Sequence, residues 1–201
     1  MDFVRPSAAA SLSLGRARAA RVLIVGPLGQ GVGLATDALA LAAAQSGSPA
    51  ATVACMRPAL GQRACATLVR LGDVSDARPD SADLLLAFGV AAAIEARSLL
   101  SPTGTGLVLT QPRPAGWRSR LGAACDASLL DGRIRCWPGP IAAEAQLARV
   151  WTLLGWLSAR IGLSQKVWRP VLHASVPRRL SVAAQLAFAA GRAIDSGPQR
   201  F

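Results

Sequence analysis

The stretch RVLIVGPLGQGVGLATDALALAAAQSG, residues 21–47, decides the fold class. A short run of Val, Leu and Ile at 22–25 comes directly before a glycine-rich turn, and a segment rich in Ala and Leu follows at 31–45. The first run predicts a buried parallel strand, and the second predicts a helix. A strand, a glycine turn and a helix in this order are how a dinucleotide-binding fold usually begins.

The rest of the chain continues this alternation of short apolar runs and helical segments. Strands are predicted at 51–55, 66–72, 82–89, 107–110 and 132–140, and helices after 89 to about 100, at 141–161, near 164–174 and at 181–193. Alternating strands and helices imply right-handed crossovers and a sheet with helices on both faces. The sequence therefore predicts an α/β fold, a three-layer Rossmann-like, mostly parallel sheet with a C-terminal helical extension.

Three parts of the chain are expected from these patterns. Residues 1–20 are rich in Ala, Ser and Arg without a continuous apolar core, so we expect a flexible tail rather than a secretory signal. Residues 21–140 form the predicted Rossmann-like core. Residues 141–201 supply helices that are expected to pack on this core and on a partner subunit.

Composition argues against several classes of protein. The chain has 201 residues, 52% of them apolar, and a net charge of +11 in which Lys166 is the single lysine. The arginines are spread from Arg5 to Arg200 without interleaved aromatic residues, so no nucleic-acid groove is expected. No apolar stretch reaches the ~20 residues that a membrane-spanning helix requires. An acidic partner protein or a phosphate-bearing ligand would suit the charge equally well.

Cysteine and histidine usage predicts no metal site. The four cysteines are Cys55, Cys65, Cys125 and Cys136, no two of which form a C-x-x-C pair, and His173 is the single histidine. Zinc sites and iron–sulfur clusters need several ligands at close spacing. Separate thiols in a reducing cytoplasm are the expected arrangement.

The glycine turn lacks two features that a bound dinucleotide requires. In such turns the second glycine lets the backbone approach the pyrophosphate, and an acidic residue about 20 positions later holds the ribose hydroxyls. Leu28 occupies the second position, and no acidic residue occurs between Asp37 and Asp73. Gly26 and Gly31 can still form the tight turn and admit a packed helix. Dinucleotide binding in the usual pose is therefore not expected. A stand-alone NAD(P)-dependent oxidoreductase remains an alternative function.

The same stretch resembles the start of the gamma-type domain of the 2-oxoacid:ferredoxin oxidoreductases. Three further segments resemble that family in the right order, at 60–72, 82–96 and 153–193, so that the likeness covers about residues 20–193. The family pattern in the first stretch is an apolar strand, then G-x-G-G-Q-G, then a helix. The residues that match the family's motifs are Gly26, Gly29, Gln30, Gly31, Gln62, Arg63, Arg70, Ala187, Phe188 and Gly191.

The chain departs from the family pattern at three places. Leu28 replaces the middle glycine of the loop, Ala64–Cys65 replaces a glycine pair after Gln62–Arg63, and Gly89 replaces a glutamate after Phe88. A loop with fewer glycines has less freedom to adopt positive φ or to let a ligand approach closely. The departures leave open a divergent substrate, or a subunit that keeps only its assembly role.

The resemblance implies a subunit of an enzyme that decarboxylates a 2-oxoacid oxidatively to an acyl-CoA, with the indolepyruvate or aryl-pyruvate type as the nearest subgroup. Thiamine diphosphate and iron–sulfur clusters are expected on a larger cytoplasmic partner that passes electrons to ferredoxin, and coenzyme A is implied for the complex. No catalytic residue is expected on this chain. The residues expected to contact a cofactor are Gly26, Gly29, Gln30, Gly31, Gln62 and Arg63.

Three tryptophans stand close together near the C-terminus. Trp151 and Trp156 lie on one predicted helix, and Trp168 follows shortly after it. Tryptophan is enriched both in buried cores and in contacts between chains. Two roles therefore remain open, core packing and anchoring of a partner subunit, and the second predicts that Trp151→Ala or Trp156→Ala releases the chain from its partner.

Overall fold

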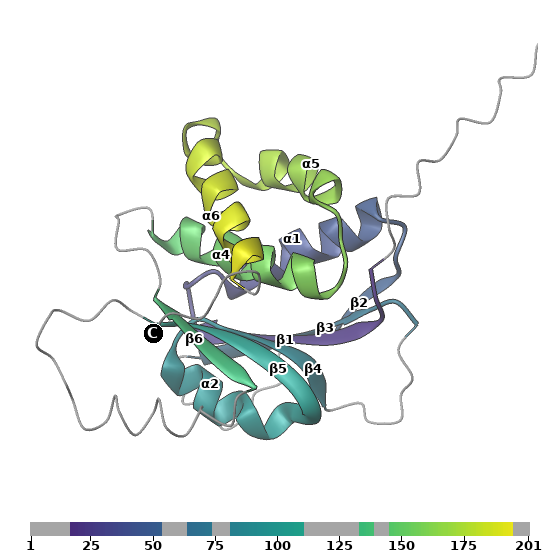
Figure 1. The fold of residues 1–201 in the computed structure, drawn as a ribbon, viewed down its shortest axis with the longest axis vertical. Coiled ribbons are helices and arrows are strands. Elements are labelled where there is room, and N and C mark those ends of the chain that lie inside the picture. Colours follow the sequence, from purple (N-terminus) through teal and green to yellow (C-terminus); the bar gives the residue numbers. More distant parts are fainter. Residues whose placement is uncertain (1–16, 54–63, 74–80, 111–132, 139–144, 195–201) are drawn as a thin grey trace, which may run out of the picture.

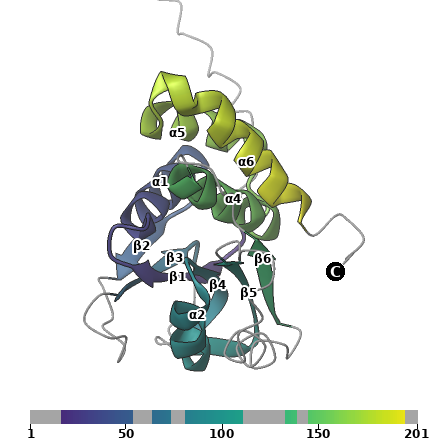
Figure 2. The same cartoon turned by 90° about the vertical axis from the view of Figure 1, so that its left-hand side faces the viewer.

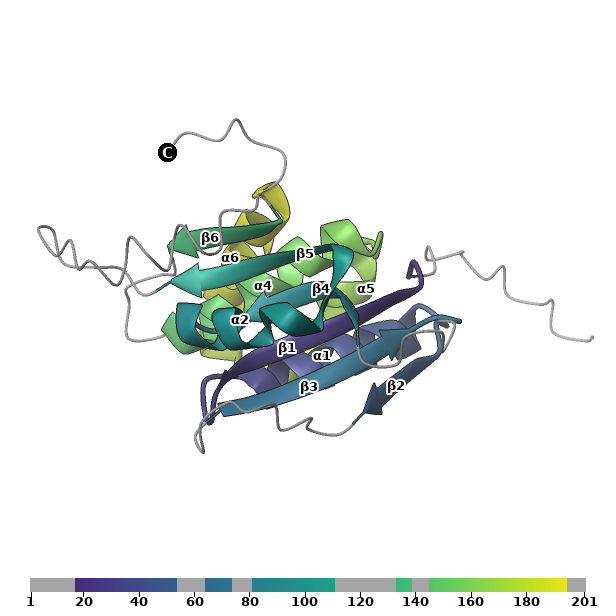
Figure 3. The same cartoon turned by 90° about the horizontal axis from the view of Figure 1, so that it is seen from below.

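The computed structural model describes residues 17–53, 64–73, 81–110, 133–138 and 145–194. Its strands form one sheet in the order β2-β3-β1-β4-β5-β6, and Figure 3 shows them side by side. Strands β1, β4, β5 and β6 are parallel, whereas β3 runs antiparallel to both of its neighbours. The bounds are β1 (Ala20–Pro27), β2 (Ala50–Val53), β3 (Ala64–Leu71), β4 (Ala82–Ala87), β5 (Leu100–Thr110) and β6 (Ile134–Pro138).

Helices cover both faces of this sheet (Figure 1). Helices α1 and α4 lie on one face and α2 lies on the other, while α5 packs on α1 and α6 packs on α4. The predicted fold class, a mostly parallel sheet flanked by helices, is confirmed. The bounds are α1 (Val32–Gln45), α2 (Val90–Ala96), α4 (Ala145–Arg160), α5 (Gln165–Ser175) and α6 (Ser181–Ala193), with short 3-10 turns η1 (Arg97–Leu99) and η2 (Arg178–Leu180).

The continuous apolar run of β1 follows from burial on both faces. Val22 and Ile24 join the cluster beneath α1 and α4, whereas Leu23 and Val25 join the cluster beneath α2. Successive side chains of a strand point to opposite faces of the sheet. A central strand covered on both sides therefore needs apolar residues at every position.

Strand β5 is longer than the sequence predicts. It begins at Leu100 rather than 107 and includes Pro102 and Gly104, residues that suggest a turn. Ala82 pairs with Leu100, and the register shifts before the next pair, so that β5 holds extra residues at this irregularity. Proline and glycine are tolerated in strands at such irregular positions.

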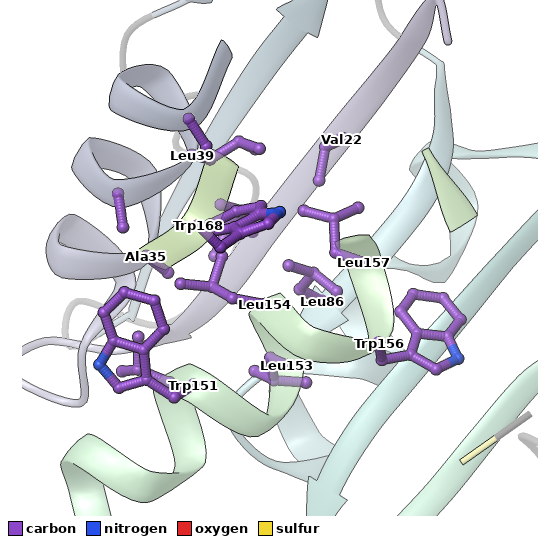
Figure 4. Packing of buried hydrophobic residues seen from close by; sticks show 14 of the residues in the cluster. Val22, Ala35, Leu39, Leu86, Trp151, Leu153, Leu154, Trp156, Leu157 and Trp168 are labelled. Carbon is purple, nitrogen blue, oxygen red and sulfur yellow. The ribbon is translucent and has the colours of Figure 1, made fainter. Parts of the chain in front are cut away.

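The three tryptophans belong to the core of this chain. Trp151, Trp156 and Trp168 are each at most 1% exposed. The ring centroids of Trp151 and Trp168 are 6.5 Å apart, and those of Trp168 and Phe188 are 5.5 Å apart. Figure 4 shows the three tryptophans in the cluster that also contains residues of α1 and the sheet. Side chains covered in this way cannot anchor a partner, so the interface role considered above is wrong.

Helices α4 and α6 touch backbone to backbone. A Cβ atom added at Gly155 would lie 2.1 Å from the carbonyl oxygen of Phe188, and one added at Gly191 would lie 2.0 Å from that of Thr152. Only glycine leaves room for so close a crossing. The contact between these two helices thus explains why positions 155 and 191 are glycines and why Phe188 lies at the crossing.

An ion pair joins the starts of β1 and β4. The Arg21 Nη2 atom lies 3.0 Å from Asp83 Oδ1, and the Arg21 Nε and backbone N–H both donate to Asp83 Oδ2. Burial alone would raise the pKa of Asp83, but the hydrogen bonds and the charge of Arg21 together lower it. The carboxylate is therefore favoured in the folded state.

Asp83→Asn is expected to make the free energy of unfolding less dependent on pH in the acidic range. A carboxyl whose pKa is lowered by folding contributes stability above its unfolded pKa, about 3.9, and loses it as the pH falls through the folded value. Because Asp83 is 38% exposed, the contribution at neutral pH is about 1 kcal/mol at most. Urea unfolding of both proteins between neutral and strongly acidic pH measures this, and parallel curves would contradict it.

Candidate functional site

The carboxyl ends of the parallel strands meet along one edge of the sheet, here named the carboxyl edge. Strands β1, β4, β5 and β6 end there at Pro27, Ala87, Thr110 and Pro138. Because β3 is antiparallel, its first residue, Ala64, pairs with Pro27 at the same edge. In open α/β sheets ligands bind outside this edge.

The glycine loop between β1 and α1 lies on the carboxyl edge. Gly29 and Gly31 adopt φ values of 79° and 101°, in the left-handed region that side chains disfavour. The Gln30 backbone N–H donates to the Pro27 carbonyl at 3.2 Å, which closes the turn. Leu28 stands at its tip and is 64% exposed.

Two of the loop glycines are required by close packing. A Cβ at Gly26 would lie 2.7 Å from the Cβ of Phe88, at the end of β4. One at Gly31 would lie 2.4 Å from Val150 Cγ2, on α4. Gly29, in contrast, has no atom of the described residues within 4 Å of such a Cβ. Gly26 and Gly31 therefore have structural roles, while Gly29 leaves open space beside the loop.

Helix α4 brings two polar side chains to the carboxyl edge. The Gln146 Nε2 donates to the Gly29 carbonyl. One turn later, Arg149 Nη2 donates to the Leu109 carbonyl at 3.4 Å, near the end of β5. Positions 146, 149 and 150 are i, i+3 and i+4, so they share one helix face. No sequence motif indicated Gln146 and Arg149. The one available signal was their spacing ahead of Val150, which places the three residues on one helix face.

Arg149 is a partly buried cation that has no acidic partner among the described residues. Burial lowers the pKa of its guanidinium, although arginine stays charged at neutral pH. Its Nε is buried and has no hydrogen-bond partner in the described part of the chain, where the one ion pair joins Arg21 to Asp83. A cation in this state favours a nearby anion.

Backbone donors add to this preference for an anion. Gly31 caps α1 without a side-chain hydrogen bond, and the first turn of a helix presents N–H groups that lack intrahelical partners. Positions Gly29, Gly33 and Gly89 each have open space where a Cβ would stand. The carboxyl edge can thus receive a phosphate or carboxylate group.

The predicted site residues are only partly described. The structure places Gly26 near the end of β1, and Gly29, Gln30 and Gly31 in the loop that follows it, so all four lie together at the carboxyl edge. Gln62 and Arg63 lie outside the described residues, although Arg63 directly precedes Ala64 in the sequence. Cys65 Sγ contacts the Gly26 carbonyl at 3.6 Å.

Two features are absent from the described residues. They contain no group of three or more His, Cys, Asp or Glu side chains arranged to hold a metal ion. Their helices include none with the length and apolar composition needed to span a membrane.

The sheet order removes the usual place for a dinucleotide's ribose. In the Rossmann fold the strand beside β1 is parallel to it and ends in the acidic residue that binds the ribose. Here that neighbour is β3, which is antiparallel and ends at Leu71, at the opposite edge. The carboxyl end of the strand next to β1 on that side therefore lies away from the loop, and the start of β3, at Ala64, lies beside it instead.

No family model matches the sequence, and no curated protein matches it significantly. Solved structures do match. The gamma subunit of a keto/oxoacid ferredoxin oxidoreductase from Geobacter sulfurreducens aligns with a TM-score of 0.62 and 21% identity, over 85% of this chain and 95% of that one. A pyruvate oxidoreductase subunit from Thermotoga maritima aligns with a TM-score of 0.60 and 16% identity, over 87% and 95%.

A longer chain also contains this fold. The 2-oxoglutarate:ferredoxin oxidoreductase from Magnetococcus marinus, solved with 2-oxoglutarate, coenzyme A and succinyl-CoA bound, aligns with a TM-score of 0.66 and 18% identity. The match covers 92% of this chain but only 32% of that one. At these identities the likeness shows a shared fold.

Proposed function

We propose that this chain is the small, gamma-type subunit of a 2-oxoacid:ferredoxin oxidoreductase. The observation that carries the proposal is the shared fold with two separate oxidoreductase subunits over nearly their whole lengths. The order of the sequence motifs supports the same assignment. In this proposal a larger partner chain holds thiamine diphosphate and the iron–sulfur clusters, and it passes the electrons to ferredoxin.

The finer assignment is an indolepyruvate or aryl-pyruvate type of enzyme in the cytoplasm. It rests on the sequence resemblance. In that subgroup the small subunit is a separate chain, as it is here. The C-terminal helices, residues 141–201, would contact the partner in addition to the core. A stand-alone NAD(P)-dependent oxidoreductase is not favoured, because Leu28 and the antiparallel β3 oppose the usual pose.

The carboxyl edge suits a phosphate of coenzyme A. The open space beside Gly29, the uncapped start of α1 and the partly buried Arg149 are the features that favour an anion there. The glycine loop (Gly26, Gly29, Gln30, Gly31) and Gln62–Arg63 would hold the cofactor. When bound, coenzyme A supplies the thiol that accepts the acyl group; the residues of this chain would bind and orient it.

Purification of the tagged chain from its native cells tests the assembly. We expect a larger protein to copurify, with thiamine diphosphate and the broad visible absorption of iron–sulfur clusters, and the complex to reduce ferredoxin with a 2-oxoacid and coenzyme A. Recovery of the chain without such a protein would contradict the proposal. A complex that stays active without this chain would favour the alternative of a non-catalytic assembly subunit.

Arg63→Ala is expected to impair the assembled enzyme more than Arg16→Ala. Arg63 precedes the strand that starts beside the glycine loop, whereas Arg16 belongs to the N-terminal segment expected to be a tail. Loss of a guanidinium that binds a phosphate costs about 1.5–3 kcal/mol, so KM for coenzyme A should rise at least about tenfold. Steady-state kinetics of complexes obtained in equal yield measure the effect, and equal KM values would exclude this role.

A further inference from the structure

Helices α5 and α6 form a hollow on the side of the molecule far from the sheet. Figure 2 shows the two helices at the end opposite α2. The hollow has a volume of about 390 Å³, with Trp168, Leu172 and Phe188 as its apolar floor. Its rim is polar and consists of Gln165, Lys166, Arg169 and Gln185.

An uncovered apolar strip adjoins this hollow. Helix α6 turns Ala184, Phe188 and Gly191 inward, whereas Val182 and Leu186 are 68% and 67% exposed. These two positions are i and i+4, and Gln185 on the rim is at i+3 from Val182, so it neighbours Val182 on the helix surface. Exposed leucine and valine beside an apolar hollow are typical of an interaction surface.

The charge around the hollow has a single sign. No Asp or Glu occurs anywhere from 145 to 194. Lys166 and Arg169 stand on the rim, and Arg178 and Arg179 precede α6; all four are exposed. None of the four forms an ion pair with any part of the chain that the structure describes. A complementary surface must therefore be acidic.

We propose that the hollow and the apolar strip dock an amphipathic helix of a partner protein, with an apolar stripe flanked by Asp or Glu. The apolar stripe would cover Val182, Leu186 and the floor of the hollow, and the carboxylates would reach Lys166 and Arg169. A groove between two helices suits a third helix, which buries side chains at i, i+3, i+4 and i+7.

A protein helix explains the shape better than an anionic membrane does. The apolar floor lies below the cationic rim, so an occupant must project side chains into a concavity. A helix that lies on a membrane needs its own apolar face flanked by basic residues. The only basic residue of α6 is Arg192. The inference specifies the chemistry of the partner's contacting segment and does not depend on the proposed oxidoreductase activity.

Binding of a designed peptide to the purified full chain tests this surface. The probe is a labelled helical peptide of about 18 residues, with Leu at i, i+3, i+4 and i+7 and Glu on both flanks, which spans about 27 Å. Fluorescence anisotropy measures its affinity. A second peptide with Gln in place of Glu isolates the contribution of charge.

We expect the Gln peptide to bind at least about tenfold more weakly, and the double variant Lys166→Glu/Arg169→Glu to weaken the Glu peptide by a similar factor. Leu186→Ser should also weaken it several-fold. The matched controls are Arg97→Glu, in the η1 turn beyond α2, and Leu41→Ser, a leucine on α1 that is 46% exposed. Both should leave the affinity unchanged.

Three results would overturn the inference. The first is that the Glu peptide does not bind. The second is that the affinity is unchanged when the Gln peptide replaces the Glu peptide, or when the double variant replaces the original chain. The third is that the chain binds phosphatidylglycerol vesicles and the double variant abolishes this binding but still binds the peptide. The measurement needs no catalytic partner, so its outcome and that of the copurification experiment are independent.

Discussion

Gly191→Ala is expected to lower the free energy of unfolding by about 3 kcal/mol, the upper end of the usual cost of overpacking. The new Cβ would lie 2.0 Å from the carbonyl oxygen of Thr152, which belongs to the backbone of α4 and cannot rotate away. Helix α6 must then move off α4, and contacts of Phe188 in the core are lost. Gly155→Ala meets the Phe188 carbonyl at 2.1 Å and should behave in the same way.

Gly33→Ala is the matched control for this change. Gly33 is also helical, but no atom lies within 4 Å of the position its Cβ would take. Alanine there should raise stability by up to about 1 kcal/mol, because glycine costs more backbone entropy in a helix. Urea unfolding followed by circular dichroism measures all three variants, and equal effects at 33 and 191 would contradict the close helix crossing.

Trp151→Ala is expected to cost about 3–5 kcal/mol of unfolding free energy. Its ring contacts those of Trp168 and Phe188, at centroid distances of 6.5 Å and 6.2 Å, and thereby connects α4 with α5 and α6. Alanine would leave a cavity among three helices. Trp151→Phe, which fills part of that space, should cost clearly less.

Trp137→Ala serves as the control, because Trp137 on β6 is 39% exposed. Its removal should change stability by about 1 kcal/mol or less. The same urea titrations compare the variants. A stable Trp151→Ala protein that fails only to bind a partner would return this residue to an interface role.

Local patterns in the sequence were sufficient to predict the strands and helices of the described regions. Apolar runs marked β1 and β4, and the glycine turn marked the start of α1. The antiparallel direction of β3 was not predictable, because a strand's residues carry no signal for the direction of its neighbour. The sequence-based start of β5 at 107 was wrong, since β5 begins at Leu100 and Pro102 and Gly104 are accommodated at an irregular pairing.

The site was predicted less completely than the fold. Loop residues 26–31 were found because glycine spacing is a local signal. Gln146 reaches Gly29 across 117 positions of sequence, a contact that only the packing of α4 creates. The choice between core and interface for Trp151 likewise depends on which helices cover it, and tryptophan is favoured in both settings.

The insertion of β3 also determines the order in which this protein can acquire its structure. Strands β1 and β2 are consecutive and joined by α1, yet no ladder connects them, and β3 pairs with both. A nascent chain that has emerged only as far as Val53 therefore has no partner for β1, whose residue Ala20 pairs with Leu71. The glycine loop is held in place only after these more distant pairings form. Such non-local pairing slows folding, and an N-terminal fragment ending after β2 would have no sheet of its own.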